Sequence, residues 1–155
     1  MKTPEEEREI LLWAFKNNTD AVDFFSLASE ISQIFDDIWD GDKEVGRELA
    51  LKMMLMAMVD LPRTKFYQVF GADAVTLIEN TWMRWLESND LEATKDEELL
   101  RISYITRSST TDMMIEMAGM LHGREWRREV AAKVRPWIYN DNEKFCDYLA
   151  EHQGG

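Results

Sequence analysis

Four aspartates gather in one short stretch of the sequence, FDDIWDGDKE at residues 35–44. Asp36, Asp37 and Asp40 lie close together there, with Trp39 among them. In an α-helix, Asp36 and Asp40 would lie about 40° apart, with Asp37 about 60° beyond Asp40. Carboxylates on adjacent turns suit Mg²⁺, which binds one or two of them together with substrate phosphate oxygens and waters. The stretch therefore predicts either a magnesium site or the solvated face of an amphipathic helix, and a solvated face is the commoner outcome.

Asp36, Asp37 and Asp40 have the spacing DDxxD, and Arg47 follows them. Locally the sequence resembles the first aspartate-rich motif of the isoprenyl diphosphate synthases, an all-helical family in which this motif coordinates Mg²⁺ on an allylic diphosphate. The chain departs from that family because it is much shorter, and because it lacks a second DDxxD and the upstream lysine and arginine substrate clamp. The resemblance therefore implies diphosphate–metal chemistry in general and not prenyl synthesis.

A second pair of acids, Asp112 and Glu116, lies on a predicted helix over 95–121 that is apolar around most of its circumference. Acids on a buried helix must be paired, hydrogen-bonded, neutralised or metal-bound. One interpretation pairs them with arginines; the other places them across a cleft from the aspartates of 36–40, so that carboxylates of two helices share a metal. We favour the arginine pairing. The arginines considered as partners are Arg84, Arg101 and Arg107.

A basic stripe is predicted on the helix over 124–138, where Arg124, Arg128 and Arg135 share one side and Trp126 lies opposite. On an acidic chain this stripe is suited to a phosphate or to an acidic partner surface. Solvated arginines above a buried tryptophan face are the alternative interpretation. The ten methionines fall mainly into two groups, at 53–58 and 113–120, which predict either core packing or an adaptable groove for a partner helix.

Apolar residues recur at helical spacing along the chain, and no alternating strand pattern is present. The pattern predicts an all-α fold, a single compact bundle of about seven or eight helices that forms one domain over 1–155. Expected capping residues are Thr3, Thr19, Asp42, Asp73, a Thr94–Glu97 capping box and an Asn140–Glu143 pair. The expected helices cover 4–17, 20–40, 42–61, 64–70, 74–88, 95–121, 124–138 and a last segment that begins near Glu143.

The formal charge of −12 disfavours nucleic acid and leaves a basic protein partner or a divalent cation as candidates. Cys146 is the single cysteine, which excludes an internal disulfide and favours a reducing compartment. The start MKTPEEEREI lacks a signal-peptide pattern, and the longest apolar run, at 49–61, is too short and too charged to cross a bilayer. We expect a cytoplasmic protein with no membrane segment.

Three strings, LPRTKFYQVFGADA, ENTWMRWLESNDLE and LLRISYITRSSTTDMM, give most of the chain a texture that resembles small uncharacterised proteins of tailed bacteriophages. This resemblance implies the host cell cytoplasm and no particular chemistry. The leading hypothesis is an acidic helical interaction protein, a phage accessory factor that binds a host or phage protein. The alternative is a Mg²⁺-dependent enzyme acting on a diphosphate or nucleotide through the DDxxD cluster. A homodimer that buries long apolar segments is compatible with both.

Overall fold

The computed structural model describes residues 2–41, 46–140 and 143–153, and every regular element in these ranges is helical. The all-α prediction is confirmed. None of the described helices is both long and apolar enough to cross a membrane. In chain order, the elements are α1 (Pro4–Ala14), α2 (Thr19–Asp40), α3 (Arg47–Leu55), a π-helical segment η1 (Met56–Asp60), α4 (Leu61–Arg63), α5 (Lys65–Phe70), α6 (Ala72–Glu92), α7 (Glu97–Thr106), α8 (Ser109–His122), α9 (Arg124–Asn140) and α10 (Phe145–Gln153).

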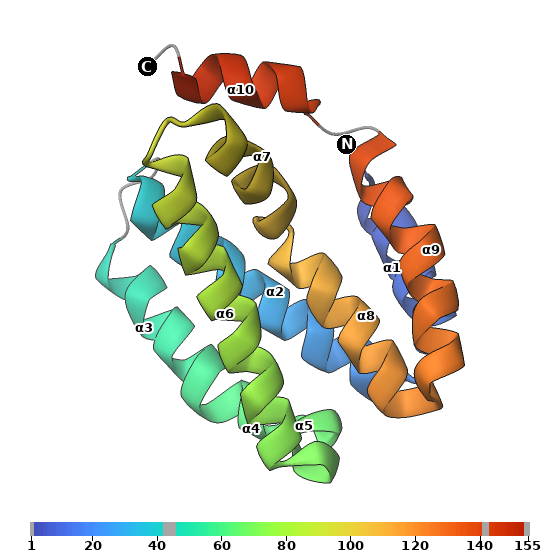
Figure 1. Cartoon of the computed structure of the whole chain (residues 1–155). Coiled ribbons are helices and arrows are strands. Elements are labelled where there is room, and N and C mark those ends of the chain that lie inside the picture. Colours follow the sequence, from blue (N-terminus) through green and yellow to red (C-terminus); the bar gives the residue numbers. More distant parts are fainter. Residues whose placement is uncertain (1, 42–45, 141–142, 154–155) are drawn as a thin grey trace.

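Helices α2 and α8 occupy the centre of the fold (Figure 1). Helix α8 packs against α1, α2, α6 and α9, while α2 also packs against α1 and α5. The main core lies between these helices and includes Phe24 and Ile31 from α2, Met113 and Met117 from α8, and Val130 from α9. Helix α10 lies across one end of the molecule, where it covers α7 and closes a smaller second core.

Helix starts follow local hydrogen bonding. The capping box predicted at Thr3 is present, because Glu6 N–H donates to Thr3 Oγ1 at 3.2 Å and Thr3 N–H donates to Glu6 Oε2 at 2.7 Å. Helix α2 is capped by Asn18 and not by Thr19, since Asn18 Oδ1 accepts the N–H of Ala21 at 3.0 Å. The sequence therefore located this helix start to within one residue.

The expected boundaries of two further helices were wrong. Helix α6 begins at Ala72 after Gly71, so Asp73 lies in its first turn and does not cap it. Helix α7 is capped by Asp96, whose Oδ1 accepts the N–H of Leu99 at 3.1 Å. Thr94 instead donates its hydroxyl to the carbonyl of Leu91 at 2.7 Å, just beyond the end of α6. The expected capping roles of Asp42 and of the Asn140 side chain lie outside the described residues.

The long helix expected over 95–121 is in fact two helices, α7 and α8, which are separated at Arg107 and Ser108. Ser108 has φ −80° and ψ 46°, which is not helical. Residues 106–111 are mostly serine and threonine, whose hydroxyls compete with the helix for backbone partners; Thr106 Oγ1, for example, donates to the carbonyl of Ile102 at 2.8 Å. The four hydroxyl residues that follow the break, Ser108 to Thr111, all line one hollow of the molecule.

The segment expected as one helix over 42–61 also differs. Within the described residues α3 begins at Arg47, and the helix continues past Pro62 to Arg63 through the wider turn of η1. Leu61 N–H donates to the carbonyl of Met56, a π-type bond immediately before Pro62, which has no N–H to offer. Met56 is buried, but Met54 and Met58 are exposed, so the first methionine group does not lie wholly in the core.

Candidate functional site

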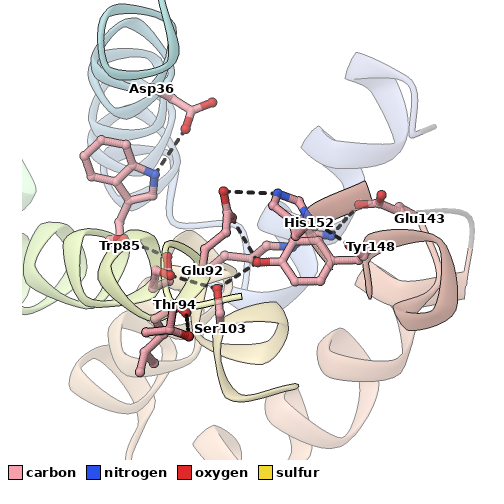
Figure 2. A network of polar contacts seen from close by, with 11 residues as sticks. Asp36, Trp85, Glu92, Thr94, Ser103, Glu143, Tyr148 and His152 are labelled. Atoms are coloured by element: carbon pink, nitrogen blue, oxygen red, sulfur yellow. Dashed lines mark hydrogen bonds and ion pairs between the residues drawn. The ribbon is translucent and has the colours of Figure 1, made fainter. Parts of the chain in front are cut away.

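Of the three DDxxD aspartates at the end of α2, Asp36 lies on the side of that helix facing α6. Trp85 Nε1 donates to Asp36 Oδ1 at 3.1 Å, a contact that Figure 2 shows. Gln33 Nε2 donates to Asp37 Oδ1 at 3.2 Å, one turn away on the same helix. Asp36 and Asp37 are partly buried, whereas Asp40 is exposed at the end of α2. The acidic face is therefore a partly packed one, with Asp36 held in place by the indole of α6.

The acids of α8 are neutralised by arginines. Glu116 pairs with Arg84 of α6, one of the three arginines considered from the sequence. Asp112 pairs with Arg135 of α9 at 2.9 Å, an arginine that the sequence had placed on the partner-binding stripe. The other two arginines considered pair elsewhere, Arg101 with Glu97 at 2.7 Å and Arg107 with Glu143 at 3.2 Å. Asp112 and Glu116 thus form ion pairs that join α8 to its neighbouring helices α9 and α6.

The two acidic groups have separate surroundings. Asp36 and Asp40 line one hollow, and Glu116 lines a second, smaller one of about 360 Å³ beside Arg124 and Arg127. Among the residues that the structure describes, no group of three or more His, Cys, Asp or Glu side chains is placed to hold one metal ion. Magnesium binding by the DDxxD aspartates stays a prediction, whereas the alternative in which Asp112 and Glu116 of α8 share that metal is not what the structure shows, because both acids pair with arginines.

The stripe of Arg124, Arg128 and Arg135 lies on the outer side of α9, where all three side chains are exposed. On the opposite side Val130 is fully buried, and Trp126 Nε1 donates to the carbonyl of Ala14 at 2.8 Å, which attaches α9 to α1. Because Arg135 is engaged by Asp112, the part of the stripe left for an external partner is its first two turns.

A groove of about 1270 Å³ is the main hollow that contains sequence-predicted site residues. Its lining comes from α1, α2, α6, α8, α9 and α10, together with the junction between α7 and α8. Figure 1 shows how these helices are placed: α1 and α9 lie on one side, α2 and α6 on the other, and α10 across one end. The hydroxyl residues at the α7–α8 break, Ser108 to Thr111, belong to this lining.

The groove carries a strong excess of carboxylates. Seven of them line it, against Arg107 and His152 as the basic side chains among the described lining residues. Glu143 engages Arg107 at 3.2 Å, Glu92 engages His152 at 3.1 Å, and Glu30 engages Lys52 at 3.1 Å, so the formal charge of the lining is negative even with these pairs counted. The seven acids are Glu7, Glu30, Asp36, Asp40, Glu92, Glu143 and Glu151.

Aromatic rings line the same groove. Four of the six tryptophans belong to it: Trp39, Trp82, Trp85 and Trp137. Trp39 is 58% exposed, and its ring meets that of Trp85 edge to face at 5.7 Å between centroids. An accessible tryptophan face beside carboxylates is a favourable environment for an ammonium or guanidinium group. The groove thus combines opposite charge with ring faces, the two features that hold a cationic side chain.

Two buried polar atoms of the groove residues lack a partner. Within the part of the chain that the structure describes, Ser29 Oγ and Asn89 Nδ2 are buried and form no hydrogen bond. Both residues belong to the groove lining, Ser29 on α2 and Asn89 on α6. Buried donors are normally satisfied, and an orphaned one costs about 1–3 kcal/mol.

A polar network fixes α10 at the end of the groove, as Figure 2 shows. Tyr148 is fully buried, and its hydroxyl lies 2.9 Å from Glu92 Oε2 and 2.8 Å from Ser103 Oγ. Ser103 Oγ also lies 2.8 Å from the carbonyl oxygen of Ser88. The hydroxyl groups of Tyr148 and Ser103 thus have two protons between them for three hydrogen-bonding contacts. Burial, and to a smaller extent Glu92, raises the pKa of Tyr148 to about 12 despite the opposing hydrogen bond from Ser103. The tyrosine is therefore the neutral donor to Glu92.

His152 completes this network. Its Nε2 lies 3.1 Å from Glu92 Oε1, and its Nδ1 lies 2.8 Å from the carbonyl of Tyr148. Both ring nitrogens thus face acceptors, and only the imidazolium form can donate to both at once. The network joins α6, α7 and α10, and it places Glu151 and His152 in the groove lining. Sequence reasoning missed it because Glu92 and His152 are sixty residues apart and form no local motif.

Comparisons of the chain with protein-family models, with curated proteins and with solved structures found no match.

Proposed function

We propose that the protein is a small acidic interaction module that binds a basic segment of a partner protein in the groove between α1, α2, α6 and α10. The resemblance of the sequence to phage-encoded proteins supports a host or phage protein as that partner, met in the host cytoplasm. The observation that carries the proposal is the lining of the groove, in which seven carboxylates and four tryptophans surround one continuous hollow.

The chemistry of the lining favours lysine and arginine side chains. Carboxylates form charge-assisted hydrogen bonds with ammonium and guanidinium groups, and tryptophan faces attract the same groups. Trp39 and Asp40 are adjacent at the exposed end of α2 and both line the groove, so a basic segment bound there meets a ring and a carboxylate. Recognition of this kind needs no metal and no reactive nucleophile.

The size of the groove favours a peptide segment. Small-molecule sites usually enclose about 300–1000 Å³, and this hollow of about 1270 Å³ is larger. Ser29 Oγ and Asn89 Nδ2 are buried beneath the lining, so the acids and rings at the groove surface carry the recognition.

The charge of the whole chain supports the same partner. At net −12 the protein attracts a basic segment from a distance, which speeds association and makes the rate fall as salt rises. The field does not by itself select one basic segment over another. Selection would come from the fit of side chains between the tryptophans of α2 and α6.

The test is fluorescence anisotropy with labelled peptides of about twelve residues, roughly 40 Å long when extended, that carry Lys and Arg between apolar residues. We expect saturable binding that an acidic counterpart of the peptide does not show. The double variant Glu7→Lys, Asp40→Lys should weaken binding about tenfold or more, which corresponds to about 1.4 kcal/mol.

The control is Glu125→Lys, Glu129→Lys on α9, which changes the net charge equally at exposed acids outside the groove lining. Equal losses in both double variants would mean that net charge alone attracts the peptide, and the groove would then have no specific role. Metal-dependent phosphate release from nucleotides or prenyl diphosphates that vanishes in Asp40→Asn would instead establish the alternative, a Mg²⁺-dependent enzyme using the DDxxD cluster.

A further inference from the structure

Helix α3 and η1 present an apolar side to solvent that the fold does not use. Leu51, Met54, Leu55 and Met58, here named the α3 stripe, are each between 50% and 70% exposed. Their spacing of three, one and three residues places them on one side of the helix. No residue of α3 is buried, although Leu49 and Met53 on its other side pack against the core. Two turns of helix therefore leave at least half of each of these large apolar residues open to solvent in the described chain.

The local charge favours a second copy of the chain as the partner of the α3 stripe. Residues 46–65 carry four basic and two acidic side chains, whereas the whole chain is at −12. Two copies therefore repel each other over most of their surfaces, and least at this segment. Arg47 and Glu48 lie side by side next to the stripe, so the flanks have mixed sign. A mixed flank neither selects a strongly charged partner nor repels an identical face.

We propose that the α3 stripe pairs with the same stripe of a second copy, antiparallel about a two-fold axis. In this arrangement Leu51 faces Met58 of the other copy, and Met54 faces Leu55, so each large apolar side chain meets another. The interface is isologous, as in most homodimers.

The area of the stripe sets the strength of the dimer. Four half-exposed side chains of this size offer on the order of 400 Å², about half of the roughly 800 Å² that each partner contributes to a standard interface. This matches the apolar centre of an interface, with Arg47, Glu48 and Lys52 supplying part of the polar rim. The dimer is therefore expected to be weak and concentration-dependent. It is independent of the groove, whose lining includes no residue of 46–65.

Sedimentation velocity on the full chain over a series of concentrations tests the proposal. The sedimentation coefficient should rise with concentration, and the rise should be larger at high salt, because screening weakens the repulsion between two acidic copies while the apolar contact persists. The variants Met54→Gln and Leu55→Gln, which do not change the charge, should each weaken dimerisation at least tenfold, with circular dichroism verifying that each is folded.

Met83→Gln is the matched control, because Met83 is 46% exposed on α6 and lies outside the stripe. It should dimerise as the wild type does. A wild type that remains monomeric at every concentration and salt would overturn the proposal, and so would a dimer that persists in both stripe variants or is lost equally in the control.

Discussion

Tyr148 is the residue on which the attachment of α10 depends most. Its hydroxyl contacts Glu92 and Ser103 in a fully buried position, so replacing it removes contacts that water cannot restore. We expect Tyr148→Phe to lower the free energy of unfolding by about 1–3 kcal/mol. Tyr139→Phe is the control, because the Tyr139 hydroxyl lies in a more exposed position and should contribute less than about 1 kcal/mol. Denaturant titration that finds equal losses would contradict the network.

The same residue makes a prediction about pH. Burial raises the pKa of Tyr148 from its ordinary value of 10.0 to about 12, so the unfolded chain releases this proton at a lower pH than the folded chain does. The contribution of the protonated Tyr148 hydroxyl to the free energy of unfolding is complete below about pH 10 and is lost as the pH rises toward 12. The difference in unfolding free energy between wild type and Tyr148→Phe should therefore narrow over this range. A difference in unfolding free energy that stays constant from pH 9 to pH 12 would mean that the pKa of Tyr148 is not raised in the folded protein.

Some site residues could be found from the sequence, and others could not. Asp36, Asp40 and Trp39 stand together in one local stretch, and all three line the groove. Glu92 and Glu151 carry no local signal, because they reach the groove only through the packing of α6 and α10. Asp112, Glu116 and Arg135 were also selected from the sequence, but the structure engages them in ion pairs. Spacing identifies residues on a common helix face and not what lies opposite that face.

At the scale of the elements, the ion pair between α6 and α8 makes a separate prediction. The side chains of Arg84 and Glu116 are 30% and 17% exposed, and Arg84 Nη1 is already a buried donor without a partner among the described residues. Glu116→Ala should therefore cost about 1–3 kcal/mol, because the guanidinium is left largely unpaired. Lys52→Ala removes an exposed pair with Glu30 and should cost no more than about 0.5 kcal/mol. Equal unfolding midpoints for these two variants would contradict the packing of α6 on α8.

Periodicity predicted the type of the elements well and their ends less well. The all-α class and most of the helices follow from apolar spacing, which is independent of tertiary structure. The break between α7 and α8 was missed because apolar residues cover most of the circumference of 95–121, so their pattern does not mark the point at which the backbone leaves the helix at Ser108. The turn of η1 was missed for a related reason: a π-type bond lets the helix continue through Pro62, which otherwise signals a helix end.

At the scale of the whole molecule, two surfaces have different tasks in this account. The groove lies between α1, α2, α6 and α10 and carries the acids and tryptophans, while the α3 stripe carries apolar side chains near basic ones. The sequence identified Asp36, Trp39 and Asp40 but not the extent of either surface, because the extent depends on which helix faces the packing leaves open. The net charge of −12 follows directly from the sequence, and it agrees with a basic ligand for the groove.

The most direct test of the central claim is an NMR titration of the indole N–H signals of the six tryptophans with the basic peptide. Trp39 and Trp85 line the groove, whereas Trp13 and Trp126 pack on each other outside its lining, with ring centroids 5.1 Å apart. We expect the signals of Trp39 and Trp85 to shift in a saturable way while those of Trp13 and Trp126 stay in place. Saturable binding that moves only Trp13 and Trp126, or none of the six signals, would contradict the groove as the binding site.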